Sequence, residues 1–282
     1  MKTLSLFKGP AIGLGTWQMG EQASEGKKEV AAILHALAQG VRLIDTAEMY
    51  ANGRSEALVG QALKAFGEQH RSELTLVTKV LPHNASKSGT VRACEDSLRR
   101  LGTDYIDIYL LHWESSHPYE QTIEAFASLR ERGLIRHWGV SNFDLKPLAQ
   151  WLAAEEDMGL SDGCATNQVF YSLMARGPEF DLLPAMENVE MPLMAYTPLG
   201  SGELARHAGL MRIAATLGVS AAQLALAWTI RSGRVVAIPK SASPARIDDN
   251  LAAASLTLPE QVLRDIDALF PPPQRKRPLA MV

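Results

Sequence analysis

Short apolar segments alternate with longer amphipathic segments along almost the whole chain, and this alternation strongly limits the folds that the sequence can adopt. Apolar residues at helical spacing predict helices over 27–40, 55–67, 89–102, 122–133, 144–155 and 221–233. Each short apolar segment between them ends in a polar turn and predicts a strand. The expected strands cover residues 11–15, 41–45, 74–79, 106–112, 135–142, 164–168, 192–196 and 235–240.

Eight strand and helix units in 282 residues favour an α/β fold of the (β/α)8 TIM barrel type, with residues 1–282 forming a single domain. The strands are almost continuously apolar and therefore need cover on both faces, which a barrel ringed by helices provides. Residues 2–10 predict an N-terminal β-hairpin before the barrel. Residues 243–254 and 258–269 predict a last pair of helices, the second an extra C-terminal one, and the proline-rich tail at 271–282 predicts irregular structure.

The composition points to a small-molecule partner. The formal net charge is −3 and no basic patch is evident, so no nucleic-acid binding is expected. No segment approaches 20 apolar residues, and the first residues do not resemble a secretory signal, so we expect a cytoplasmic protein without a membrane span. Cys94 and Cys164 are not expected to form a disulfide, and the histidine spacing predicts no metal site. Nothing in the sequence demands an interface, so a monomer is expected.

Polar residues stand where the predicted strands end. In a (β/α)8 barrel the carboxyl ends of the strands surround one mouth, where the chemistry takes place. Asp45, Lys79 and His112 end the second, third and fourth strands, and Tyr50 follows Asp45 in the next loop. The later strands end in Ser141, Asn142, Gln168, Tyr196 and Lys240. The pattern therefore predicts that side chains far apart in the sequence converge on one opening.

Four of these residues have complementary chemistry. A phenol donates a proton readily only when its pKa falls, and the ammonium of Lys79 can lower the pKa of Tyr50. Asp45 can hold Lys79 in place and keep it charged, and His112 can orient a substrate oxygen. Each residue alone is more often a cap, a surface group or a satisfied core residue. Their joint occurrence favours a proton-donating site.

Several motifs occur in a recognisable order. GLGTW spans 13–17, DTAEMY spans 45–50, LLHW spans 110–113 and GVSNF spans 139–143. They are followed by NQ at 167–168, YTPLGS at 196–201 and IPKSASPARIDDN at 238–250. With these motifs the sequence resembles the aldo-keto reductase superfamily along nearly its whole length. It looks most like a bacterial branch that includes methylglyoxal-reducing members.

The resemblance implies an NADPH-dependent aldo/keto reductase, an oxidoreductase that converts aldehydes and ketones to alcohols. Tyr50 is then the general acid, Asp45 and Lys79 are its partners, and His112 positions the carbonyl. The cofactor supplies the hydride, and the protein supplies alignment and a proton. The substrates implied first are small 2-oxoaldehydes such as methylglyoxal, followed by aromatic aldehydes. Trp17 and Trp113 would provide apolar walls for the substrate.

The resemblance also assigns the cofactor contacts, and NADPH is favoured over NADH. The nicotinamide end would be held by Gly15, Thr16 and Asp45 beside the ribose, by Ser141, Asn142 and Gln168 at the carboxamide, and by Tyr196 stacked on the ring. The rest would be held by Leu199 and Ser201 at the pyrophosphate, by Lys240, Ser241 and Arg246 at the 2′-phosphate, and by Asn250 at the adenine. A guanidinium fork and an ammonium together suit a phosphate dianion.

Two alternatives remain open from the sequence. Some barrels of this family bind nicotinamide cofactor mainly to regulate a partner protein, with vestigial turnover. A barrel isomerase or hydrolase using Asp45 and His112 without a redox cofactor is the second. The glycines of GLGTWQMG at 13, 15 and 20 do not have the GxGxxG spacing, so a dinucleotide fold of the Rossmann type is not indicated.

Overall fold

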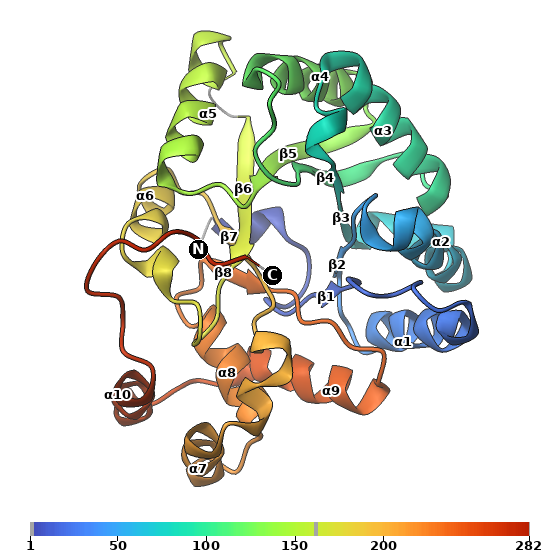
Figure 1. Ribbon diagram of the computed structural model, residues 1–282. Coiled ribbons are helices and arrows are strands. Elements are labelled where there is room, and N and C mark those ends of the chain that lie inside the picture. The colour runs from blue at the N-terminus through green and yellow to red at the C-terminus, as the bar shows by residue number, and fades with distance from the viewer. Residues whose placement is uncertain (1–2, 161–162, 282) are drawn as a thin grey trace.

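The computed structural model describes residues 3–160 and 163–281. Its strands form one parallel sheet of eight, ordered as in the sequence, and Figure 1 shows them at the centre of a ring of helices. The strands are β1 Leu14–Gly15, β2 Leu43–Asp45, β3 Thr75–Val80, β4 Ile106–Leu111, β5 Ile135–Ser141, β6 Cys164–Phe170, β7 Leu193–Tyr196 and β8 Val235–Ala237. The predicted (β/α)8 architecture is confirmed.

The first and last strands close the barrel through a few contacts. The regular parts of β1 and β8 are shorter than predicted, but parallel bridges join Ile12 to Ala237 and Gly15 to Lys240. The backbone N–H of Gly15 donates to Pro239 O at 3.1 Å. A Cβ at position 15 would lie 2.7 Å from the carbonyl oxygen of Ile238, so only glycine permits this close approach.

The helices lie outside the strands. They are α1 Gly26–Ala38, α2 Arg54–Phe66, α3 Lys87–Leu101, α4 Tyr119–Glu131, α5 Leu145–Asp157, α6 Leu182–Asn188, α7 Ala208–Thr216, α8 Ala221–Ile230, α9 Pro244–Ala252 and α10 Glu260–Leu269. The predicted helices are confirmed, including the last pair and the C-terminal extra helix. Helices α6 and α7 were not predicted, because seven and nine residues are too few for a clear helical period, and Pro184 and Gly209 weaken the local propensity.

The apolar strands are buried on both faces. Leu43, Val77, Ile108 and Met194 belong to a cluster inside the barrel, whereas Ile44 belongs to the larger layer between the strands and the helices. Successive residues of a strand point to opposite faces, so a strand buried on both sides must be apolar at nearly every position. This is the physical reason for the nearly continuous apolar runs in the sequence.

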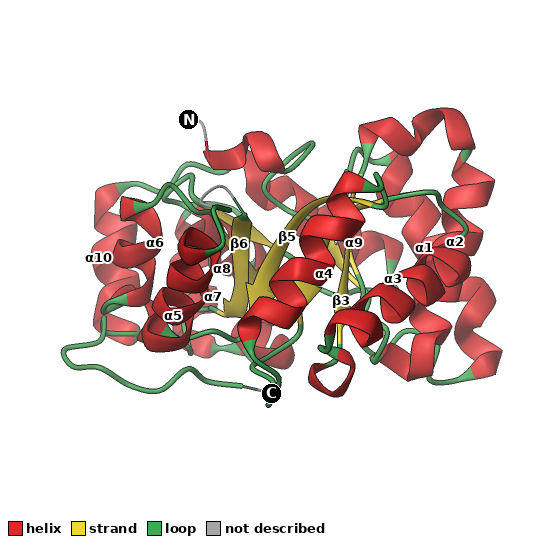
Figure 2. Ribbon diagram, turned by 90° about the horizontal axis from the view of Figure 1, so that it is seen from above, coloured by secondary structure: helices red, strands yellow, loops and turns green. Residues whose placement is uncertain are grey.

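The predicted N-terminal β-hairpin is wrong. Residues Thr3–Leu6 form a short 3-10 helix, and Phe7 packs with the cluster inside the barrel, with 6% of its surface exposed. Lys8 fixes the segment, since its backbone N–H donates to Thr75 Oγ1 and its Nζ donates to Ser72 O. The apolar residues that suggested a strand therefore close one end of the barrel, opposite the face reached by the C-terminal tail (Figure 2).

The tail after α10 is irregular as far as residue 281, as predicted. It crosses the face on which the strands end (Figures 1 and 2), where Met281 lines a cavity. Lys276 holds the tail in place through salt bridges with Asp144, at the start of α5, and with Asp181, at the start of α6. Segments distant in the sequence are thereby held together at this face.

The sequence also predicts that Cys94 and Cys164 form no disulfide and that the chain has no membrane span. Cys94 and Cys164 are free thiols. Among the described residues, no single helix has the length and apolar character needed to cross a membrane. Helices α7 and α8 taken together pass that test by length and composition alone, with a bend of 83° between them.

Candidate active site

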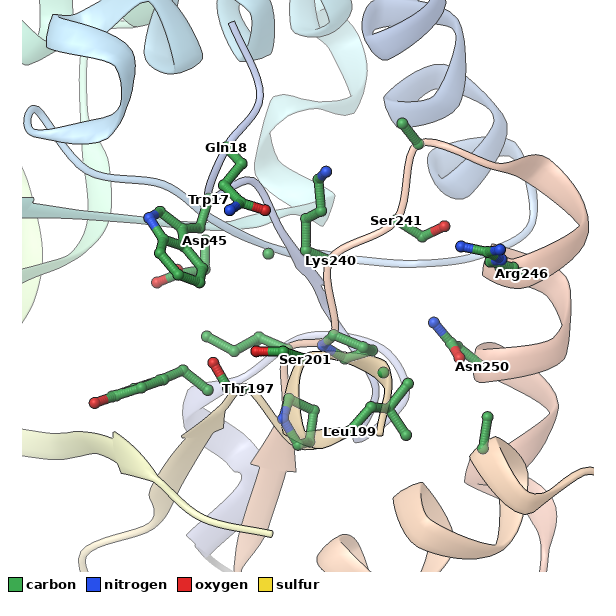
Figure 3. Close-up of a pocket in the computed structure, with 18 of the residues that line it drawn as sticks. Trp17, Gln18, Asp45, Thr197, Leu199, Ser201, Lys240, Ser241, Arg246 and Asn250 are labelled. Atoms are coloured by element: carbon green, nitrogen blue, oxygen red, sulfur yellow. The ribbon is translucent and has the colours of Figure 1, made fainter. Parts of the chain in front are cut away.

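A cavity of about 1020 Å³ opens where the strands end. Figure 3 shows Trp17 and Asp45 at one end of it, and Arg246 and Asn250 at the other. Lys240 lies along one side, opposite the segment that contains Leu199 and Ser201; the figure labels all three. The cavity is therefore elongated, and its ends differ in chemistry.

Asp45 and Lys79 form a buried ion pair at the first end. Lys79 Nζ lies 2.9 and 2.8 Å from the two carboxylate oxygens of Asp45 and also donates to Thr46 O at 2.9 Å. The side chain of Lys79 is fully inaccessible to solvent and that of Asp45 nearly so. Charges buried this deeply are tolerated only when paired and hydrogen-bonded, as these are.

Tyr50 completes the contacts of Lys79. Its hydroxyl oxygen lies 3.1 Å from Lys79 Nζ, within a buried environment. The chain reaches this position through a tight turn, in which Ala51, Asn52 and Gly53 all have positive φ angles of 50°, 54° and 82° before α2 begins. Left-handed backbone is easiest for glycine and tolerable for asparagine, so the ANG sequence suits this turn.

The electrostatic prediction for Tyr50 needs correction. Burial raises the pKa of Tyr50, and although the ammonium of Lys79 lowers it, the net direction is upward. The predicted net lowering of the Tyr50 pKa is therefore wrong, because the desolvation of a phenolate outweighs one neighbouring cation. Tyr50 is protonated at neutral pH, and Lys79 is placed to stabilise the negative charge that appears when the proton leaves.

The pair itself is also perturbed by burial. Burial acts to lower the pKa of Lys79, but Asp45 and Tyr50 outweigh it, so the pKa of Lys79 is raised. Burial raises the pKa of Asp45, and Lys79 and Gln168 oppose that rise. Lys79 is thus charged at neutral pH, and its ammonium balances the carboxylate.

His112 is neutral and faces the cavity. Burial, reinforced by the charge of Lys79, lowers the pKa of His112 to about 2. Its Nδ1 is buried and has no hydrogen-bond partner among the described residues, and its ring meets that of Tyr50 edge-on, with centroids 5.9 Å apart. In the tautomer protonated on Nε2, the ring can donate a hydrogen bond to a ligand oxygen beside the Tyr50 hydroxyl.

Ser141, Asn142, Gln168 and Tyr196 gather next to these residues, as their strand-end positions predicted. The backbone oxygen of Gln168 accepts from Ser141 Oγ at 2.9 Å and from the backbone N–H of Asn142 at 2.8 Å. Asn142 has a φ of 60°, which turns its side chain so that Oδ1 accepts from Tyr196 OH at 2.8 Å. All four line the cavity.

Gln168 makes a contact that the sequence did not indicate. Its Nε2 donates to Asp45 Oδ1 at 2.7 Å, across the barrel from β6 to β2. Asn142 is similarly engaged, because its Nδ2 donates to the backbone oxygen of His112 at 3.1 Å. These amides therefore support the buried ion pair and the histidine as well as facing the cavity.

Of the two residues expected beside the nicotinamide ribose with Asp45, the structure places one at the cavity. Gly15 lines it, but Thr16 is fully buried and does not. Thr16 Oγ1 instead donates to the backbone oxygen of Asp45 at 3.0 Å and accepts from Ser55 Oγ at 2.8 Å. The side chain of Thr16 thus fixes the end of β2, and a contact of this residue with the ribose stays a prediction.

The opposite end of the cavity is cationic. Lys240, Ser241, Arg246 and Asn250 all line it, together with Leu199 and Ser201. Among residues 3–160 and 163–281, no acidic side chain forms a salt bridge with Lys240 or Arg246. Other arginines, such as Arg176, Arg231 and Arg42, are paired with acids or carbonyls. Two unpaired cations beside a hydroxyl and an amide are suited to bind an anionic group.

The mouth near Tyr50 is largely apolar. Trp17 and Trp113 line it as predicted, and the Trp113 ring packs on His112 with centroids 4.8 Å apart. Met281 reaches the same cavity from the tail, and Gln18, with a φ of 66°, reaches it from the loop after β1. The sequence offered no signal for Met281, because no periodic pattern places an irregular tail. For Gln18 the signal is its place directly after the GLGTW motif.

Comparisons with known proteins agree on one family. The Aldo/keto reductase family model matches residues 11–270. Methylglyoxal reductase YeaE of Escherichia coli is 44% identical, with 97% of this chain and 95% of YeaE covered.

Solved structures give the same result. An aldo/keto reductase from Klebsiella pneumoniae, crystallised with NADP and acetate, is 46% identical with a TM-score of 0.91, covering 97% of this chain and 95% of that one. An aldo/keto reductase from Brucella melitensis is 32% identical with a TM-score of 0.80, covering 92% and 93%. The shared barrel, the match over most of the chain and the arrangement at the strand ends lead to one assignment: the chain belongs to the aldo/keto reductase family.

Proposed function

We propose that this protein reduces small aldehydes and ketones with NADPH, and that 2-oxoaldehydes such as methylglyoxal are its first substrates. The observation that carries the proposal is the Tyr50 hydroxyl, held 3.1 Å from the buried ammonium of Lys79 at the end of an elongated cavity. The identity to a methylglyoxal reductase supports the substrate. Crystals of a similar reductase with NADP support the cofactor.

The residues present fit NADPH. Lys240 and Arg246, which form no salt bridge within the described part of the chain, suit the 2′-phosphate at one end, with Ser241 beside them and Asn250 toward the adenine. Leu199 and Ser201, along the side of the cavity, suit the pyrophosphate. At the other end, Gly15, Ser141, Asn142, Gln168 and Tyr196 suit the nicotinamide and its ribose.

The chemistry assigned to the side chains is general acid catalysis. When bound, NADPH supplies the hydride that reduces the carbonyl carbon. Tyr50 donates its hydroxyl proton to the carbonyl oxygen, and Lys79 stabilises the resulting phenolate. Asp45 keeps Lys79 charged and in place. Neutral His112 donates from Nε2 to the same oxygen and fixes the orientation of the substrate.

The substrate end favours compact neutral carbonyls. Trp17, beside Asp45 in Figure 3, and Trp113, packed on His112, line it with aromatic surface, and Met49, next to Tyr50 in the chain, adds a thioether. Lys79, the cation nearest to the reacting group, is saturated by Asp45, Thr46 and Tyr50, so it cannot also bind a carboxylate on the substrate. This supports methylglyoxal and aromatic aldehydes over carbonyl compounds that carry a carboxylate.

A carbonyl panel tests the proposed function. Purified protein should oxidise NADPH in the presence of methylglyoxal, with a higher kcat/KM than for neutral ketones or oxo acids. NADPH binding without consumption by any carbonyl would instead favour a nicotinamide-binding regulatory module. Failure to bind either nicotinamide nucleotide would favour the redox-independent barrel enzyme.

Arg246→Ala should weaken NADPH binding much more than NADH binding. We expect about a 10- to 100-fold rise in Kd for NADPH and less than a threefold rise for NADH, because a charge-assisted contact to the 2′-phosphate is lost. Fluorescence titration of both nucleotides measures this. As a matched control, Arg212→Ala removes an exposed arginine of α7 that does not line the cavity and should change neither Kd. Equal weakening of both nucleotides would contradict the assignment.

The remaining expectations belong to the same proposal. We propose that residues 1–282 act as one domain, as a monomer in the cytoplasm. The near-neutral charge balance and the free thiols of Cys94 and Cys164 support it. Light scattering after gel filtration should give the mass of one chain.

A further inference from the structure

One hydrogen bond joins the proposed nicotinamide end to the buried ion pair. Gln168 and Asp45 lie on strands β6 and β2, yet Gln168 Nε2 lies 2.7 Å from Asp45 Oδ1. Both side chains are almost inaccessible, with 1% and 2% of their surface exposed. A carboxylate only accepts hydrogen bonds, so the amide must present its NH₂ group to Asp45.

This orientation fixes what the rest of the Gln168 amide can do. The backbone oxygen of Gln168 is held by Ser141 Oγ and by the N–H of Asn142, so the residue has little freedom to turn. No described residue donates to its Oε1, and Gln168 lines the cavity. Its carbonyl oxygen is therefore the group left to meet a donor on a ligand, while its NH₂ group holds Asp45.

Asp45 depends on such donors because it is buried. Lys79 contacts both of its oxygens, and Gln168 supplies the additional donor to Oδ1. Burial raises the pKa of Asp45, and the hydrogen bond from Gln168 is one of the interactions that oppose the rise. Losing that donor would favour the protonated carboxyl, which no longer balances the charge of Lys79.

We propose that Gln168 is a positioning residue for proton transfer as well as a cofactor ligand: its amide fixes the Asp45 carboxylate, and through it the Lys79 ammonium, against the Tyr50 hydroxyl. The inference deepens the proposed function and rests on it. Binding of the carboxamide to Oε1 then orders the same amide that holds Asp45, so occupancy of the nicotinamide end and alignment of the proton donor are coupled.

The first test measures the pKa of Asp45 in the cofactor-free protein, by carbon-13 NMR of the side-chain carboxyl, with Asp45→Asn to assign the signal. Gln168→Met keeps the length of the side chain but removes the donor. This substitution should raise the pKa of the Asp45 carboxyl, so that its acid dissociation constant falls about tenfold or more. Gln168→Asn, whose amide is too short to reach Asp45, should shift it in the same direction and guards against misfolding of the first variant.

Ser141→Ala is the matched control, because Ser141 contacts the backbone of Gln168 and belongs to the same proposed carboxamide site but does not touch Asp45. It should weaken NADPH binding while leaving the pKa of Asp45 unchanged, because the backbone N–H of Asn142 still holds the carbonyl of Gln168 in place. An unchanged Asp45 pKa in both Gln168 variants would overturn the inference. This measurement needs no turnover, so it is separable from a failure of the carbonyl panel.

The second test follows single turnover with saturating NADPH. In Gln168→Met the single-turnover rate of carbonyl reduction should fall about 10- to 100-fold. In a plot of this rate against pH, the loss of rate on the acidic side should begin at a higher pH than in the wild type, because Asp45 becomes protonated earlier as the pH falls. In Ser141→Ala the loss of rate on the acidic side should occur at the same pH as in the wild type. If Gln168→Met binds NADPH more weakly but keeps the single-turnover rate and the pH profile of the wild type, Gln168 is a cofactor ligand only.

Discussion

Tyr50→Phe should lower kcat for methylglyoxal reduction by about 100- to 10,000-fold, the usual contribution of a positioned general acid. The substitution removes only the hydroxyl that lies 3.1 Å from Lys79 Nζ and leaves the ring that packs against His112. Because the proposed function assigns that hydroxyl to the substrate and not to the cofactor, the Kd for NADPH should stay within a few fold. Steady-state kinetics and fluorescence titration measure the two quantities.

Tyr119→Phe is a matched control for this substitution. Tyr119 also loses only a hydroxyl, one that donates to the exposed Glu114, and it does not line the cavity. Its kcat should remain close to that of the wild type. A Tyr50→Phe enzyme with wild-type turnover would mean that another group donates the proton.

Lys79→Met should have a large effect on both stability and activity. It leaves Asp45 as an uncompensated buried charge with Gln168 as its remaining side-chain donor, which destabilises a protein by about 3–5 kcal/mol. It also removes the cation that stabilises the Tyr50 phenolate, so reduction should fall to a trace. Denaturant unfolding at neutral pH and kcat measurements test the two parts.

The double variant Asp45→Leu, Lys79→Met separates the two effects. Replacing both members of a buried ion pair by apolar residues of similar volume is often neutral or stabilising, so most of the lost unfolding free energy should return. Catalysis should not return, because Tyr50 still lacks its cation. Recovery of activity with stability would show that the pair serves folding alone.

Much of the fold followed from periodicity. Strand β4, Ile106–Leu111, is buried at every position and apolar at all of them but Asp107, because it is covered on both faces. The N-terminal segment misled because an apolar and polar alternation fits a hairpin, whereas Phe7 packs inside the barrel. Helices α6 and α7 have no clear sequence pattern because short helices depend on tertiary packing more than on their own periodicity.

The sequence predicts the site residues that stand at the ends of strands. Asp45, Lys79 and His112 converge because parallel strands in chain order bring successive ends together. The contact between Gln168 and Asp45 was not predictable, because it spans 123 positions and depends on side-chain direction across the barrel. Thr16 shows the same limit, since its neighbour Gly15 faces the cavity while its own hydroxyl turns toward the backbone of Asp45.

The electrostatics of Tyr50 were only half predictable. The sequence indicated that a lysine would act on the phenol, and the structure places Lys79 there. It could not indicate how completely the phenol is buried, and burial raises the pKa of Tyr50 against the effect of Lys79. The balance between desolvation and one cation depends on packing density around the hydroxyl, which only the folded chain defines.

The most direct test of the central claim, that Tyr50 donates the proton, is the pH profile of kcat for methylglyoxal reduction with saturating NADPH. The wild type is compared with a protein carrying difluorotyrosine in place of Tyr50, which keeps the ring and hydroxyl but makes the phenol more acidic. If Tyr50 is the acid, kcat falls as the phenol loses its proton, and the fluorinated protein shows that fall at lower pH. A basic limb at the same pH in both proteins would contradict the account.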